Sequence, residues 1–118
     1  MTLLQNAIIA REKLTHYLLV YKNRNDKSAW LEKAGYTLEN WQILEKDLRN
    51  QILSQDAAET EKTEFGQLFE IRGILVGPNG KSLSVISIWM TDCITGNTKF
   101  ITMYPDKISA KGGWDNEI

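Results

Sequence analysis

Apolar residues in the first half of the chain recur at helical spacing. Leu14, Leu18 and Tyr21 are separated by four and then three residues, so they share one face of a helix. This pattern predicts a first helix within residues 6–21. The polar residues 22–26 that follow are typical of a loop.

Two more helices are expected before the middle of the chain. A short one covers residues 27–34 and ends at Gly35, a residue type common just after a helix. Thr37 then caps a longer helix over residues 38–53. Because Asn40 stands where a capping box has Glu or Gln, no capping box is expected. The longer helix has an apolar stripe made of Trp41, Leu44, Leu48 and Ile52.

The second half of the chain changes period, and short apolar runs alternate with turn residues. The runs at 65–76, 82–90 and 100–104 are expected to be strands. An Asn-Gly pair within residues 77–80 predicts the first hairpin turn, and residues 95–97 predict the second. The residues between the two halves, 54–64, are expected to form a loop or a frayed helix end.

These elements predict an α+β fold. About three N-terminal helices pack on a C-terminal antiparallel meander of three to four strands. The expected domain spans residues 1–105, and a polar tail covers residues 106–118. A length of 118 residues fits one such domain.

Charge is nearly balanced over the whole chain but not locally. Fourteen bases oppose 15 acids, which gives −1 and speaks against a protein that wraps duplex DNA. Residues 11–33 hold six bases and three acids, hence +3, whereas residues 54–64 hold four acids and one base, hence −3. A nucleic-acid function would therefore depend on a small cationic patch.

Several kinds of site and compartment are not expected. One cysteine, Cys93, and one histidine, His16, do not supply a zinc ligand set, so neither a metal nor a cofactor is expected. The chain begins without a signal-like segment and contains no apolar run of membrane-spanning length. We expect a cytoplasmic protein that does not bind membranes.

Candidate catalytic groups lie on the first two helices. One helical turn separates Lys13 from His16 and Tyr17, so the three share a face. Lys27 adds a second cation at the start of the next helix. A histidine or a lysine of lowered pKa can act as a base, and a lysine can hold a phosphate.

The strands offer a second candidate set. Ser87 and Trp89 share one face of their strand, and Thr102 and Tyr104 share a face of the next. If the two strands pair, these side chains are expected to form one polar and aromatic surface with Lys99 nearby. Such a surface can stack a base and hold a phosphate.

The order of single residues along the chain resembles an uncharacterised bacterial domain family. The resemblance covers residues 6–105 and rests on Asn6-Ala-Ile-Ile, Glu12-x-Leu14-x-x-Tyr17-Leu-Leu, Lys27-x-Ala29-Trp30-Leu31, Gly35-Tyr36-Thr37, Trp41-x-x-Leu44, Phe65-Gly66-x-x-Phe69, Trp89 and Lys99-Phe100-Ile101-Thr102-x-Tyr104-Pro105. In its layout that family is similar to the barnase–EndoU–colicin–RelE superfamily of ribonuclease toxins, many of which end on Thr-x-Tyr-Pro.

The resemblance implies a metal-independent endoribonuclease toxin. RNA, including transfer RNA, would be the substrate, and a small antitoxin or immunity protein would neutralise it. The resemblance points to Lys13, Lys27, Trp89, Thr102 and Tyr104. Together with the candidates chosen from the residues themselves, the expected catalytic residues are Lys13, His16, Lys27, Thr102 and Tyr104, and the expected substrate-binding residues are Tyr17, Ser87, Trp89 and Lys99. Lys99 stands where the superfamily usually has Arg, so a bidentate phosphate clamp is replaced by a point charge.

A second hypothesis stays open beside the enzyme. The near-neutral charge, the acidic stretch 54–64 and the lack of a sharp catalytic motif also suit a non-catalytic interaction module. An antitoxin or an immunity protein would belong to this class.

Overall fold

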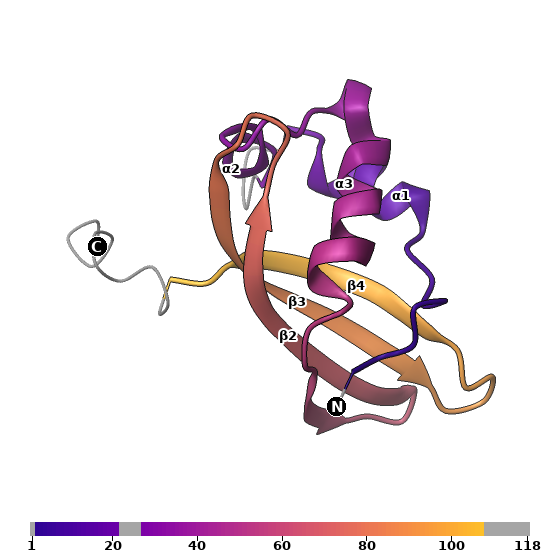
Figure 1. The fold of residues 1–118 in the computed structure, drawn as a ribbon. Helices are drawn as coiled ribbons and strands as arrows, with labels where there is room; N and C mark the ends of the chain where they lie inside the picture. The colour runs from indigo at the N-terminus through magenta and orange to yellow at the C-terminus, as the bar shows by residue number, and fades with distance from the viewer. Residues whose placement is uncertain (1, 22–26, 108–118) are drawn as a thin grey trace.

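The structure is a computed structural model that describes residues 2–21 and 27–107. Figure 1 shows an N-terminal helical half followed by an antiparallel sheet, which confirms the α+β prediction. In chain order the elements are α1 (Arg11–Lys13), the π-helical turn η1 (Leu14–Leu18), α2 (Ser28–Glu32), the 3-10 turn η2 (Leu38–Asn40), α3 (Trp41–Asp47), the π-helical turn η3 (Leu48–Ile52), β1 (Ala58–Lys62), β2 (Gly66–Val76), β3 (Ser82–Asp92) and β4 (Thr98–Pro105). Within the described ranges, no helix has the length and apolar character needed to cross a membrane.

The first helix consists of α1 and the π-helical turn η1 that directly follows it. Leu14 and Leu18 are fully buried, as the helical spacing predicts. The prediction for Tyr21 is wrong, because the exposed fraction of its side chain is 72%. The helix ends at Leu18, so Tyr21 lies beyond it. The buried residue after the helix is Leu19 and not Tyr21.

The second and third helices begin and end close to the predicted residues. After α2 the backbone of Gly35 takes φ +95°, and the Tyr36 N–H donates to Leu31 O (3.2 Å), the pattern of a Schellman end. The prediction that no capping box forms is wrong. The Thr37 N–H donates to Asn40 Oδ1 at 2.7 Å, because an Asn amide oxygen serves in place of a Glu carboxylate.

The apolar stripe of the long third helix packs as predicted. Leu44, Leu48 and Ile52 are fully buried, and Trp41 packs against the core at the start of α3. The helix continues from α3 into η3, which contacts β2. Figure 1 shows this helix lying across the sheet.

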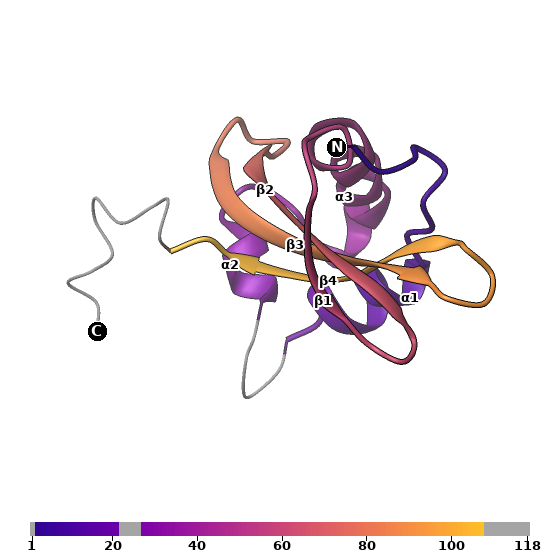
Figure 2. The ribbon, with the colours of Figure 1, turned by 90° about the horizontal axis from the view of Figure 1, so that it is seen from below.

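The sheet is an antiparallel meander with the order β1-β2-β3-β4. The β2–β3 hairpin pairs without interruption from Gly66↔Asp92 to Val76↔Ser82, and its turn contains the predicted Asn-Gly pair, with Gly80 at φ +87°. Figure 2 shows how strongly these strands twist, with β4 passing beside α2.

The expectation for residues 54–64 is wrong in part, since Ala58–Lys62 forms the edge strand β1. All five of its side chains are exposed, so the strand has no buried face and no alternation of apolar and polar residues. A register shift between Glu59 and Lys62 interrupts its pairing with β2. Irregularity and charge of this kind are common on open sheet edges.

Packing contacts continue past the predicted boundary at residue 105. The Asp106 N–H donates to Ser84 O (2.9 Å), and its carboxylate, only 2% exposed, lies 3.2 Å from Arg72 Nη1. Asp106 therefore belongs to the packed domain. The remainder of the expected tail, 108–118, lies outside the described residues.

Candidate functional site

Three side chains that are far apart in the sequence meet beside strand β4. Lys27 Nζ donates to the Tyr17 hydroxyl (2.9 Å) and to Thr102 Oγ1 (3.1 Å), and these two hydroxyl oxygens lie 3.0 Å apart. The first two residues come from the helical half, and Thr102 comes from the last strand. We call these three residues, together with Lys13 and Tyr104, the Lys27 cluster.

Aromatic rings surround the ammonium group of this cluster. Lys27 Nζ lies 5.2 Å from the ring centre of Tyr17 and 5.8 Å from that of Tyr104. Lys13 Nζ lies 6.0 Å from the Tyr17 ring. Contacts of this length stabilise a cation through the ring quadrupole, but they do not neutralise its charge.

In the described part of the chain, Lys27 has no acidic partner. Within residues 2–21 and 27–107, no carboxylate lies within ion-pair distance of its ammonium group. A lysine has three N–H donors, and Lys27 uses two of them on hydroxyl groups of the described chain. The described residues therefore use two of its three donors, and they place no carboxylate against its charge.

The same lysine changes the acidity of its neighbour. The hydrogen bond from Lys27 holds the pKa of the Tyr17 phenol below its usual value of 10.0, and the hydrogen bond with Thr102 acts in the same direction. Partial burial opposes this shift, and the charges of Lys27 and Lys13 add to it. Tyr17 therefore reaches its phenolate form more readily than an ordinary tyrosine.

Local irregularities of the backbone position these groups. Tyr17 lies in the π-helical turn η1, four residues after Lys13 and so on the same helical face. Thr102 follows a register shift in the pairing of β3 with β4, where Ile101 is the extra residue. π-helical turns and β-bulges often re-aim side chains at functional sites. β4 is an edge strand of the sheet, and the start of its outer edge pairs with Ile8.

Two predicted site residues lie outside the cluster. His16 directly precedes Tyr17 but is exposed, and it makes no hydrogen bond with the described part of the cluster. Lys99 is also exposed and lies at the start of β4. There it adds to the lowering of the Asp92 pKa, which comes mainly from the Thr95 N–H and then from the Ile94 N–H.

The predicted common surface of β3 and β4 is wrong. Ser87 pairs with Met103 and Trp89 with Phe100, whereas Ile88 pairs with Thr102 and Ile86 with Tyr104. Paired residues share a face, so the two expected sets lie on opposite faces of the sheet.

Ser87 and Trp89 are both fully buried. The indole N–H of Trp89 donates to Ser87 Oγ (2.8 Å), and its ring packs edge-on against Phe100 at 5.2 Å between ring centres. Neither side chain is accessible to a substrate, and Trp89 cannot stack a base.

Comparison with known families classifies the chain without assigning an activity. Residues 2–107 match the model of a domain of unknown function, DUF6883. The chain belongs to the DUF6883 family. This match agrees with the expected uncharacterised domain family, but it does not connect the chain to the ribonuclease toxins. No curated protein and no solved structure matches the chain significantly.

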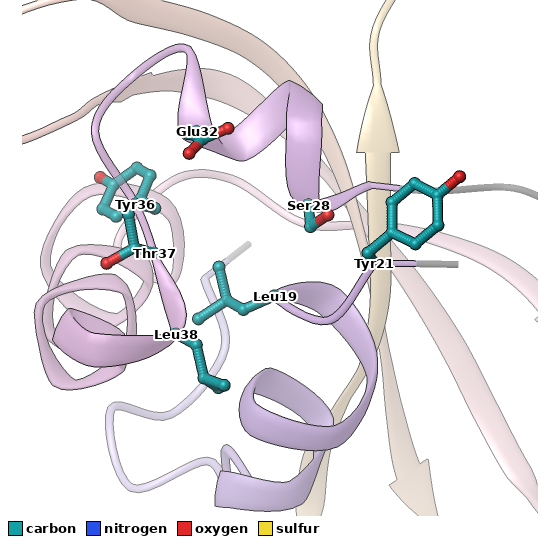
Figure 3. Close-up of a pocket in the computed structure, with 7 residues that line it drawn as sticks. All are labelled: Leu19, Tyr21, Ser28, Glu32, Tyr36, Thr37 and Leu38. Atoms are coloured by element: carbon teal, nitrogen blue, oxygen red, sulfur yellow. The ribbon is translucent and has the colours of Figure 1, made fainter. Parts of the chain in front are cut away.

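The DUF6883 domain also has a cavity that the sequence patterns do not predict. It lies between the end of η1, helix α2 and the segment that leads into η2 (Figure 3). Its lining residues are Leu19, Tyr21, Ser28, Glu32, Tyr36, Thr37 and Leu38. The one signal in the sequence is the spacing of Ser28 and Glu32, which places them on one face of a helix.

The domain shows no gathering of metal-binding side chains in its described ranges. No three His, Cys, Asp or Glu residues lie together there as they would around a metal ion. Cys93 is exposed, and its thiol donates to Glu64 O at 3.3 Å. The Lys27 cluster is therefore the strongest candidate for a chemical site in the described chain.

Proposed function

We propose that this DUF6883 domain is a metal-independent endoribonuclease that acts as a toxin in the cytoplasm. The observation that supports this proposal is Lys27, a cation held by two hydroxyl groups and two aromatic rings, with no carboxylate of residues 2–21 and 27–107 within ion-pair distance. Such a group suits the phosphate of a single-stranded RNA. A small antitoxin or immunity protein would be its neutralising partner.

The proposed reaction needs no water and no metal. The 2′-hydroxyl oxygen attacks the adjacent phosphorus, and its proton passes to a base. The bond from phosphorus to the 5′ oxygen breaks, and that oxygen takes a proton from an acid. The products are a 2′,3′-cyclic phosphate and a 5′-hydroxyl end, so atoms and charges balance.

The geometry of the cluster suggests a role for each residue. Lys27 binds a phosphate oxygen and stabilises the extra negative charge at phosphorus, while the Thr102 hydroxyl fixes the direction of its ammonium group. Tyr17, with its lowered pKa, is the best-placed base. Lys13 adds positive charge, and the Tyr104 ring covers the ammonium group from the strand side.

The experiment is a cleavage assay on transfer RNA and on a labelled single-stranded oligoribonucleotide, with EDTA present. We expect wild type to produce 2′,3′-cyclic phosphate ends. Replacing Lys27→Met keeps the apolar length of the side chain and removes the charge, so cleavage should fall at least about 100-fold. The matched control is Lys33→Met, an exposed lysine beyond the end of α2, which should cleave like wild type.

Two results would contradict the proposal. One is the absence of any RNA cleavage by the folded wild-type domain. The other is equal cleavage by the Lys27→Met and Lys33→Met variants, with both shown to be folded by thermal unfolding.

One observation favours the second hypothesis, a protein-interaction module. Phe65 and Ile94 are 65% and 90% exposed, and they lie near each other because the Cys93 N–H donates to Phe65 O (3.0 Å). Exposed apolar neighbours of this kind occur at protein interfaces. An inactive domain whose Phe65→Ser variant loses a protein partner would support this alternative.

A further inference from the structure

The cavity between η1, α2 and η2 has the size of a single aromatic ring system. Its volume is about 170 Å³. An apolar protein cavity of roughly 150 Å³ is known to hold one benzene molecule. The cavity is therefore large enough for a planar base but too small to enclose a whole nucleotide, whose sugar and phosphate would remain outside.

The walls of the cavity suit a planar ring. Leu19 and Leu38 provide apolar contacts, and Tyr36 also lines the cavity (Figure 3). The Tyr36 side chain is fully buried and its hydroxyl is bound to Asp47, so it offers a ligand no polar group. Tyr21 lies at the rim with 72% of its side chain exposed, which leaves its ring available for stacking.

The Glu32 carboxylate in the cavity wall favours a ligand that carries hydrogen-bond donors. The Glu32 carboxylate makes no hydrogen bond or ion pair with the described residues, although it lines the cavity. Ser28 lies one helical turn before it on the same face of α2. Glu32 thus presents two acceptor oxygens side by side at the edge of a site for a flat ring.

Guanine is the base that matches these acceptors. Its Watson–Crick edge carries two neighbouring donors, N1–H and the N2 amino group, which pair with both oxygens of one carboxylate. Uracil, cytosine and adenine offer one donor group on that edge. A paired, charge-assisted contact of this kind is stronger and more selective than a single hydrogen bond.

The cavity also lies beside the Lys27 cluster. Ser28 lines the cavity, and Lys27 directly precedes it, so their Cα atoms are about 3.8 Å apart. Lys27 and the cavity are therefore neighbours along the backbone, and the Lys27 ammonium group reaches from there to the Tyr17 and Thr102 hydroxyls.

We propose that this cavity is a guanine-binding subsite and that Glu32 is its specificity-determining residue. Its position next to the cleaved phosphate rests on the proposed ribonuclease function. The proposal that the cavity binds guanine does not depend on that function.

The experiment measures the binding of guanosine, adenosine, cytidine and uridine 3′-monophosphates to the whole chain by NMR titration. We expect the guanosine nucleotide to bind at least roughly tenfold more tightly than the other three. Glu32→Gln should remove most of this preference and leave the affinity for the adenosine nucleotide unchanged. Inosine 3′-monophosphate, which lacks the N2 amino group, should bind wild type more weakly than its guanosine counterpart.

Two controls separate the cavity from general effects of charge and aromatic surface. Glu39→Gln changes an exposed acid on η2 that does not line the cavity, and it should leave all affinities unchanged. Tyr21→Ala should weaken binding, whereas Phe65→Ala, which removes a similarly exposed ring, should not. Equal affinities for the four nucleotides, or an unchanged preference in Glu32→Gln, would overturn the subsite.

The outcomes also separate this subsite from the proposed activity. Binding of the guanosine nucleotide that depends on Glu32, without RNA cleavage, would support the subsite and contradict the ribonuclease. Cleavage next to all four bases at similar rates, together with equal nucleotide affinities, would support the ribonuclease and overturn the subsite.

Discussion

Two tyrosine hydroxyls of this domain have opposite partners. The Tyr17 hydroxyl accepts a hydrogen bond from Lys27, and its pKa is lowered. The Tyr36 hydroxyl donates to Asp47 Oδ2 at 2.7 Å and lies 3.2 Å from Val76 O. Burial raises the pKa of Tyr36, and the hydrogen bond and charge of Asp47 raise it further.

The difference separates a phenol that holds the fold together from one that is available for chemistry. Tyr36 is fully buried and fastens helix α3 to the end of strand β2. The Tyr36 hydroxyl stabilises the fold only while it keeps its proton and donates its hydrogen bond. Tyr17 is partly exposed, and its cationic partner favours the charged form. We therefore expect their loss to affect different properties: the proposed RNA cleavage for Tyr17 and stability for Tyr36.

The largest expected effect comes from Tyr17→Phe. This change removes one oxygen atom and leaves the ring that covers Lys27. If Tyr17 is the base, the rate of RNA cleavage should fall by about 100- to 10,000-fold. In wild type, kcat/KM should rise with pH up to a midpoint below 10.0, because the lowered pKa brings the phenolate to lower pH.

The control for this change is Thr60→Val, which removes an exposed hydroxyl on β1, outside both the cluster and the cavity. Its rate and pH profile should match those of wild type. Full activity of the Tyr17→Phe enzyme, or an unchanged pH profile, would show that Tyr17 is not the base.

A smaller effect is expected from Tyr36→Phe, and it should concern stability. Removing the hydroxyl takes the donor from Asp47, while the Val76 carbonyl keeps its hydrogen bond from Gln51 Nε2, and the loss should cost about 1–3 kcal/mol in the free energy of unfolding. RNA cleavage at a temperature where the variant is folded should stay close to wild type. Urea unfolding measures the change, and a stability equal to wild type would contradict the structural role.

The raised pKa of Tyr36 adds a dependence on pH with a definite sign. Below pH 10.0 both the folded and the unfolded states hold the proton, so the stabilisation is complete. Above that pH the unfolded state loses the proton and the folded state keeps it, so stability decreases as pH rises. The Tyr36→Phe variant should show a shallower alkaline decrease than wild type.

Sequence patterns predict well those helices and strands that have a buried apolar face, and the turn between two of them. Leu44, Leu48 and Ile52 follow helical spacing and are buried, and the Asn-Gly pair before Lys81 forms its turn. Strand β1 escapes prediction because none of its side chains is buried. The periodicity of apolar residues reports only contacts with a core, and an exposed edge strand has none.

The site is predictable in its residue types but not in its geometry. Lys13 and Tyr17 share a helical face, which spacing alone indicates. The contact of Lys27 with Thr102, 75 residues away, depends on how the helices lie along the edge of β4. Ile101, the extra residue in β4, sets which residues of β3 and β4 pair beyond it. The pattern of apolar and polar residues does not reveal this register.

The central claim about the Lys27 cluster is that Lys27 lowers the pKa of the Tyr17 phenol. Tyrosine ring NMR measures this effect directly. With ¹³C-labelled tyrosine, Tyr17 of wild type should titrate below its ordinary value of 10.0. In the Lys27→Met variant the midpoint should move upward, whereas Lys33→Met should leave it unchanged. A Tyr17 that titrates at or above 10.0 in wild type, or that is unaffected by Lys27→Met, would contradict the account.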